Sequence, residues 1–83
     1  MPMNEEKILV ELKKVLMDEF EVDEEKITPN ASFYEDLELD SLDAIDLIVT
    51  MNNVYNIDVD NKSMEEILTV QQLINTVKRY VDK

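Results

Sequence analysis

The fold is decided by the stretch Asp36-Leu37-Glu38-Leu39-Asp40-Ser41-Leu42-Asp43, at the middle of an 83-residue chain. It joins a polar segment to a run with helical periodicity. Asp40 is a favourable N-cap residue, and Asp43 places a carboxylate at the third helical position. With Asp40 as the cap, Ser41 becomes the first helical residue, and its hydroxyl is not needed for capping. We therefore expect a free, exposed hydroxyl at the positive end of a helix dipole. The alternative, favoured for an Asp-Ser-Leu tripeptide taken alone, is that Ser41 is only a tolerated residue of the first turn.

The helix that begins at Ser41 extends to about Tyr55 and carries two apolar stripes. The first is sufficient to attach the helix to a core and consists of Ala44, Leu47, Ile48, Met51 and Tyr55. The second lies to one side of it and consists of Leu42, Ile45 and Val49. One alternative is a helix buried on all sides. The acidic residues around the second stripe favour instead a partly exposed strip that docks a partner.

Two further segments have the one-sided pattern of amphipathic helices. The first follows Asn4, a good N-cap residue, and the last opens at Thr69-x-x-Gln72. The first stripe contains Ile8, Leu9, Leu12, Val15, Leu16 and Phe20. The last contains Val70, Leu73, Ile74, Val77 and Val81. Both stripes indicate core packing and imply no functional site.

Two connections join these helices. Residues 22–39 form a long one, with a capped turn expected at Ser32-x-x-Glu35. Four apolar residues should hold it against the helices: Ile27, Phe33, Tyr34 and Leu37. In the second connection, the pattern Ser63-x-x-Glu66 predicts a short helix through Leu68. The predicted fold is all-α: one small helical bundle over residues 1–83, with three main helices and a short third helix.

Composition excludes several classes of function. The chain has no cysteine and no histidine, so it has no disulfide framework, thiol chemistry or histidine-based catalysis. Asp58, Asp60 and Asn61 lack the ligand spacing and central glycine of an EF-hand, and we predict no metal site. The sequence shows neither a membrane span nor the basic and apolar regions of a signal peptide, so we expect a cytoplasmic location.

The formal net charge is −12, and no lysine or arginine occurs between Ile27 and Asn61. Such a surface repels nucleic acid and anionic membranes and favours partners with basic patches. Solubility alone is the simpler explanation of an acidic surface. Here, however, the acids gather around Ser41 and its helix. The predicted docking surface consists of Glu38, Asp40, Leu42, Asp43, Ile45, Asp46 and Val49.

Three stretches carry a family resemblance: Asn30-Ala31-Ser32-Phe33-Tyr34-Glu35-Asp36-Leu37, then Asp40-Ser41-Leu42-Asp43, and a hydrophobic helix closed by Tyr55-Asn56-Ile57-Asp58-Val59. Together they resemble the acyl carrier protein family, over nearly the whole chain from Glu5 to about Val81. The resemblance implies a carrier and not an enzyme. It also implies that Ser41 bears a 4′-phosphopantetheine arm, which a phosphopantetheinyl transferase attaches from coenzyme A. The arm's thiol would hold acyl groups as thioesters for acyl-loading and acyl-transferring enzymes.

The chain departs from the usual family pattern at several positions. Glu38-Leu39 stands where a glycine and an alanine commonly precede the Asp-Ser pair, and the chain has no glycine at all. Asn52-Asn53-Val54 replaces the acidic residues that primary fatty-acid carriers have late in this helix. These departures favour a carrier for a specialised lipid, polyketide, amino-acyl or sugar-linked pathway over a fatty-acid role. A monomer is expected. The contrasting class is an unmodified acidic interaction module, such as an inhibitor or nucleic-acid mimic.

Overall fold

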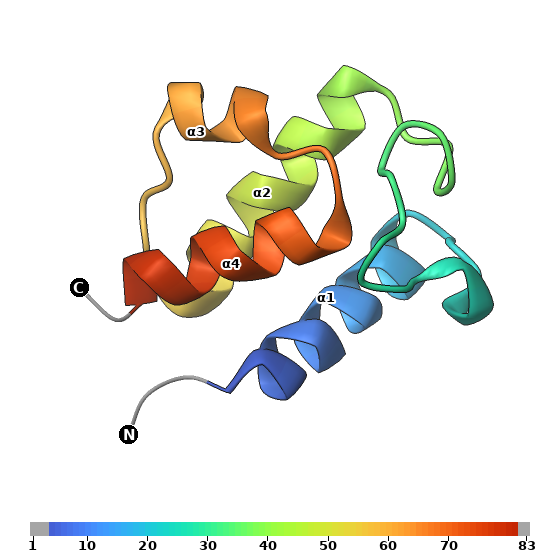
Figure 1. Ribbon diagram of the computed structural model, residues 1–83, viewed down its shortest axis with the longest axis horizontal. Helices are drawn as coiled ribbons and strands as arrows, with labels where there is room; N and C mark the ends of the chain where they lie inside the picture. Colours follow the sequence, from blue (N-terminus) through green and yellow to red (C-terminus); the bar gives the residue numbers. More distant parts are fainter. Residues whose placement is uncertain (1–3, 82–83) are drawn as a thin grey trace.

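The computed structural model describes residues 4–81. Within this range the chain forms four α-helices and one turn of 3-10 helix: α1 (Glu5–Glu19), η1 (Glu24–Lys26), α2 (Ser41–Tyr55), α3 (Asn61–Glu66) and α4 (Val70–Val81). Helices α1, α2 and α4 pack against one another, and the short α3 links α2 to α4 (Figure 1). The predicted all-α bundle, with three main helices and a short third helix, is therefore confirmed.

The ends of α1 and α4 follow from local hydrogen bonding. The side chain of Asn4 caps α1 by accepting the backbone N–H of Glu6, with 2.7 Å between Oδ1 and N. At the start of α4, Thr69 and Gln72 cap each other. Thr69 Oγ1 accepts the Gln72 N–H at 3.2 Å, and Gln72 Oε1 accepts the Thr69 N–H at 3.0 Å. Both predicted helix starts are correct.

The prediction for α3 is wrong at both ends. The helix is capped by Asp60 and not by Ser63, because Asp60 Oδ1 accepts the Ser63 N–H at 2.7 Å. Ser63 is therefore inside the first turn. The helix ends at Glu66, since Ile67 adopts an extended conformation, with φ −84° and ψ 108°. Ile67 is 3% exposed, and this extended residue turns its side chain into the core.

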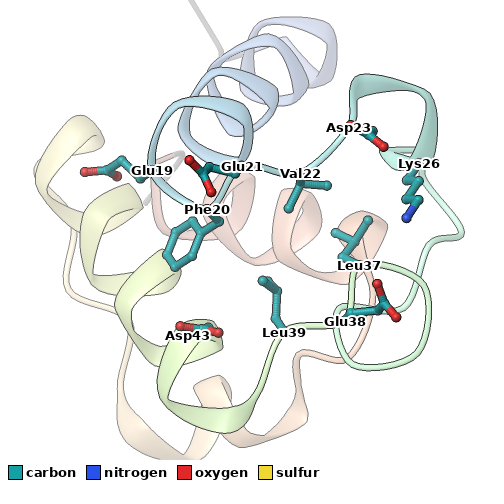
Figure 2. Close-up of a pocket in the computed structure, with 10 residues that line it drawn as sticks. All are labelled: Glu19, Phe20, Glu21, Val22, Asp23, Lys26, Leu37, Glu38, Leu39 and Asp43. Atoms are coloured by element: carbon teal, nitrogen blue, oxygen red, sulfur yellow. The ribbon is translucent and has the colours of Figure 1, made fainter.

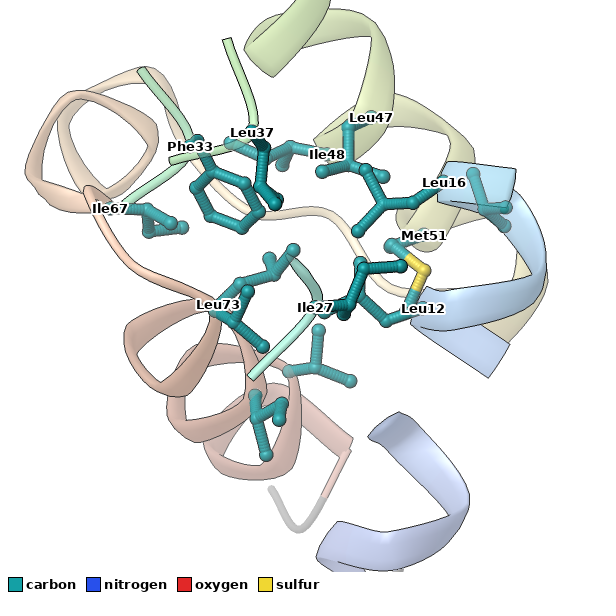
Figure 3. Packing of buried hydrophobic residues seen from close by; sticks show 14 of the residues in the cluster. Leu12, Leu16, Ile27, Phe33, Leu37, Leu47, Ile48, Met51, Ile67 and Leu73 are labelled. Carbon is teal, nitrogen blue, oxygen red and sulfur yellow. The ribbon is translucent and has the colours of Figure 1, made fainter. Parts of the chain in front are cut away.

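The core is one cluster of apolar side chains from α1, α2, α4 and the connections. Figure 3 shows Leu12 and Leu16 of α1 with Met51 of α2, and Phe33 of the long connection with Ile67. The first stripe of α2 supplies four buried residues, Ala44, Leu47, Ile48 and Met51. Tyr55, at the end of that stripe, is half-buried. The core-facing stripe is thus largely as predicted.

The long connection is held by Ile27, Phe33 and Leu37, all of which are buried as expected. The fourth expected anchor, Tyr34, is not buried: its side chain is 41% exposed. The reason is the backbone on either side of Phe33. Its N–H donates to the Leu68 carbonyl at 3.0 Å, and its carbonyl accepts the Leu39 N–H at 2.9 Å. These bonds turn Phe33 inward and leave its neighbour facing outward.

Three residues adopt the left-handed backbone conformation that glycine tolerates best: Glu21, Glu38 and Asn56, with φ of 55°, 57° and 54°. Asn56 ends α2. The N–H of the following residue, Ile57, donates to the Asn52 carbonyl at 2.9 Å, a bond typical of this kind of helix terminus. Glu38 lies just before the buried Leu39 and the cap residue Asp40. The left-handed turn at Glu38 therefore sets the direction from which the chain enters α2.

None of the helices in residues 4–81 combines the length and the apolar character that crossing a membrane requires.

Candidate functional site

The first turn of α2 is closed by a reciprocal pair of hydrogen bonds between Asp40 and Asp43. Asp40 Oδ1 accepts the Asp43 N–H at 2.8 Å, and Asp43 Oδ2 accepts the Asp40 N–H at 3.4 Å. The predicted cap is confirmed. Ser41 is the first helical residue, and its side chain is exposed. Its hydroxyl makes no hydrogen bond to any other residue of the described chain, 4–81, so it is available for reaction.

Ser41 lies at a groove of about 500 Å³ between α2 and α3. Ala44 and Ile48, both buried residues of α2, form its apolar floor. Tyr34 and the α3 residues Met64 and Glu65 line the other side. The arrangement places an exposed hydroxyl beside a largely apolar groove. Such a groove suits an aliphatic group better than a charged one.

The sequence pointed to Ser41 and Ile45 in this groove, but it did not indicate Tyr34, Met64 or Glu65. Met64 did carry a signal, because it is the single apolar residue in the α3 sequence Asn61-Lys62-Ser63-Met64-Glu65-Glu66. Tyr34 was instead expected in the core. The groove is formed by packing between distant segments, and no local pattern specifies it.

The second stripe of α2 is exposed along its length. Leu42 is 71% exposed, Ile45 46% and Val49 43%. The alternative of a helix buried on all sides is therefore wrong. Glu38, Asp40 and Asp46 are exposed as well, and Asp43 is half-buried. An apolar strip edged by carboxylates thus begins next to Ser41.

A second pocket, of about 450 Å³, lies on the side of Asp43 that faces the end of α1 (Figure 2). Glu38 and Asp43 line it, together with Glu19, Phe20, Glu21, Val22, Asp23, Lys26, Leu37 and Leu39. The predicted docking residues therefore face different places. Ile45 borders the Ser41 groove, and Glu38 and Asp43 border this acidic pocket. Leu42, Asp46 and Val49 are exposed on the outer face of α2, and Asp40 is exposed at its N-terminal cap. Within residues 4–81, no group of three or more acidic side chains is arranged to hold a metal ion.

Asn52 and Asn53, the neutral pair late in α2, have different environments. Asn53 is exposed. Asn52 is half-buried, and its Oδ1 accepts the Val59 N–H at 3.3 Å. Asn52 therefore has a structural partner in the loop before α3, whereas Asn53 is a residue of the outer surface.

Comparison with known proteins agrees with this geometry. Residues 10–77 match the family model described as "Phosphopantetheine attachment site". The acyl carrier protein of Thermosynechococcus vestitus is 35% identical over 79 residues, which cover 95% of this chain and 98% of the relative. That of Rubrobacter xylanophilus is 37% identical over 75 residues, covering 90% and 93%. The crystal structure of the Thermotoga maritima acyl carrier protein superimposes with a TM-score of 0.87 at 22% identity, covering 96% and 93% of the two chains, and shows the shared fold.

The family match and the fold together define a small helical carrier with a phosphopantetheine prosthetic group. The chain belongs to the acyl carrier protein family. Its role is to carry acyl groups, and it is not an enzyme. The residues present fit the prosthetic group, because the first turn of α2 offers an exposed hydroxyl that is free of capping duties and opens onto an apolar groove.

Proposed function

We propose that Ser41 is the attachment site of the 4′-phosphopantetheine arm. The observation that supports this is its exposed hydroxyl at the first position of α2, at the edge of the groove. In the attachment step, Ser41 Oγ forms a bond to the phosphorus of the pantetheine phosphate of coenzyme A. The bond from that phosphorus to the bridging oxygen breaks, and adenosine bisphosphate leaves. A base on the transferase takes the serine proton, and magnesium bound to the transferase offsets the phosphate charge.

The electrostatics at Ser41 are mixed. The start of a helix favours an anion such as the resulting phosphodiester by about 0.3–1 kcal/mol. The carboxylates of Asp40 and Asp43 oppose this gain. Each accepts a backbone N–H and stays within the first turn. We therefore assign the site no net stabilisation of the arm, which remains free to swing between enzymes. Tethering gives the thioester a high effective concentration at each active site that the arm can reach.

The docking surface for those enzymes is the exposed strip beside Ser41. It combines Leu42, Ile45 and Val49 with the exposed carboxylates of Asp40 and Asp46, and Glu38 and Asp43 extend it toward the acidic pocket. A partner that fits has an apolar groove with a basic rim. The phosphopantetheinyl transferase and the enzymes that load and transfer acyl groups are the partners of this kind. The same charge disfavours nucleic acid and anionic membranes.

For the pathway, we propose fatty-acid synthesis or a specialised lipid or polyketide route, with the specialised route favoured by the uncharged Asn53 on the outer face of α2. The carrier works as a single-domain monomer in the cytoplasm. The acidic, cysteine-free composition supports the cytoplasmic location, and a docking strip that one chain forms by itself supports the monomer.

The test is to incubate the purified chain with coenzyme A and a broad-specificity transferase, and to measure its mass. One added phosphopantetheinyl group is expected on the wild type and on the control Ser63→Ala, and none on Ser41→Ala. Circular dichroism of all three checks the fold. Modification of Ser41→Ala would place the arm elsewhere. No modification by any transferase would favour the unmodified acidic interaction module.

A further inference from the structure

The loop that leads into α3 is held by hydrogen bonds at two neighbouring residues, Val59 and Asp60. Val59 is 2% exposed, and Asn52 of α2 accepts its N–H. The next residue, Asp60, is held from α4. Tyr80 Oη donates to Asp60 Oδ2 at 3.4 Å, and the Asp60 N–H donates to Tyr80 Oη at 3.5 Å. In Figure 1 this loop passes beside the C-terminal end of α4.

Helix α3 touches the core through the partly buried side chain of Met64. It has six residues, a length that is marginal for a helix without tertiary support. None of its side chains from Lys62 to Glu66 is buried. The buried residues lie just outside it, at Val59 and at Ile67, which is 3% exposed. Its position is therefore set by the packing of Met64 together with the contacts at its two ends.

The first turn of α3 is also within reach of Tyr80. Ser63 Oγ lies 3.5 Å from Tyr80 Oη, and the Ser63 N–H is bonded to the same Asp60 side chain that Tyr80 contacts. One hydroxyl on α4 thus touches both the cap residue and the third helical residue of α3. We refer to Asp60, Ser63 and Tyr80 as the α3 anchor.

The α3 anchor matters for the Ser41 groove because α3 forms one of its walls. Met64 and Glu65 line the groove opposite Ala44 and Ile48 of α2. Met64 directly follows Ser63 in the chain. A shift of the first turn of α3 away from α4 would therefore move the Met64 wall and change the width of the groove.

We propose that Tyr80 is a positioning residue for the cargo: through the α3 anchor it keeps the Met64 wall closed over an acyl chain in the Ser41 groove. The proposal rests on the proposed attachment of the arm at Ser41. The oxygen–oxygen contacts of 3.4 and 3.5 Å are long for hydroxyl hydrogen bonds. A weak anchor suits this role, since the wall must hold the chain in transit and release it at the next enzyme.

The experiment compares Tyr80→Phe with Tyr55→Phe. Both variants lose only a tyrosine hydroxyl, but the Tyr55 hydroxyl is buried without a hydrogen-bond partner among the described residues. Each protein is loaded from octanoyl- or acetyl-coenzyme A by the transferase, and the thioester is cleaved with hydroxylamine. Octanoyl cleavage should be about threefold faster in Tyr80→Phe than in the wild type, the size of effect expected for a weak hydrogen bond. Acetyl cleavage should not change, because an acetyl group is too short to use the groove. Tyr55→Phe should match the wild type with both.

Equal octanoyl cleavage in the wild type and Tyr80→Phe would overturn the proposal and leave the attachment at Ser41 standing. Faster cleavage of both thioesters would also overturn the proposal, because it would indicate that the whole fold is loosened and not the wall of the groove alone. If the wild type accepts no acyl group, the attachment at Ser41 fails and the role in holding cargo fails with it.

Amide hydrogen exchange of residues 62–66 tests the α3 anchor itself in the unloaded chain. About threefold faster exchange in Tyr80→Phe supports it, and equal exchange contradicts it.

Discussion

Asn52 Oδ1 accepts the backbone N–H of Val59 at 3.3 Å and so joins the last turns of α2 to the loop before α3. The Asn52 carbonyl also accepts the Ile57 N–H at 2.9 Å. One residue therefore satisfies backbone groups at two points of this loop through different atoms. The Asn52 side-chain amide therefore holds the loop in place, although the sequence suggests only a neutral surface pair, Asn52 and Asn53.

The first prediction compares how much Asn52 and Asn53 contribute to the stability of the protein. Asn52→Ala leaves the Val59 N–H without its partner and should lower the free energy of unfolding by about 1–3 kcal/mol. Asn53→Ala changes only an exposed side chain and should have an effect of about 0.5 kcal/mol or less. Urea denaturation of both variants measures the difference. Equal effects would show that the Asn52 amide does not stabilise the loop.

The second prediction uses Asn53 alone to test partner preference. Asn53→Glu adds a carboxylate to the outer face of α2 without disturbing the bond from Asn52. A charge pair at the rim contributes up to about 1 kcal/mol, enough to change partner preference several-fold. We expect higher turnover by enzymes of general fatty-acid synthesis and unchanged attachment of the arm. Equal turnover of wild type and variant would contradict a specialised docking surface.

The third prediction separates the two stripes of α2. Met51 is fully buried, and Met51→Ala should lower the free energy of unfolding by about 2–5 kcal/mol. Val49 is 43% exposed, and Val49→Ala should lower it much less while weakening attachment of the arm or transfer of cargo. Denaturant melts combined with transferase kinetics measure both effects. Unchanged transferase kinetics in Val49→Ala would remove this residue from the docking surface.

The fourth prediction concerns salt. Because the proposed docking surface is acidic and exposed, encounter with a basic partner should be steered by charge. Raising the ionic strength should slow association with the transferase more than it speeds dissociation. Stopped-flow measurements at several salt concentrations decide this. Association rates that do not vary with salt would place the docking surface elsewhere.

The fifth prediction concerns acid. Hydrogen bonds from the backbone and side chain of Ser63 lower the pKa of Asp60 below its ordinary value of 3.8, and Tyr80 and Lys62 add to this. A lowered pKa in the folded state means that the charged form favours folding. This contribution is present above pH 3.8 and is lost as the pH falls through the lower folded value. Asp60→Asn should therefore differ most from the wild type at neutral pH and least in strong acid, by urea melts across pH. A difference that does not vary with pH would exclude a role for the Asp60 charge.

The sequence predicted α2 from Ser41 to Tyr55 because its signals are local and agree: an aspartate cap, a carboxylate one turn on and a regular apolar stripe. At α3 the local signals compete. Asp60 and Ser63 are both good caps at positions three residues apart, and tertiary structure decides between them. Val59 is buried on one side and Tyr80 contacts Asp60 on the other. The local sequence pattern predicts neither the burial of Val59 nor the contact between Tyr80 and Asp60.

The Ser41 groove was only half predictable for a similar reason. Its α2 side follows from helical periodicity, which places Ser41, Ile45 and Ile48 along one edge. Its other side combines Tyr34 with Met64, thirty residues later in the chain. Their proximity depends on how the long connection and α3 fold over α2. Exposure of Tyr34 results from the backbone bonds of Phe33, which no residue-type preference reveals.

The left-handed backbone conformation at Glu21, Glu38 and Asn56 lowers the stability of this carrier, and substitutions at these positions could raise it. A residue other than glycine in this conformation costs about 1–2 kcal/mol, somewhat less for asparagine. Replacing Glu38 with glycine would recover part of that cost, but it would remove a carboxylate from the pocket beside the first turn of α2. Glu21 lines the same pocket and offers the same exchange, so each glycine replacement would trade one surface carboxylate for stability.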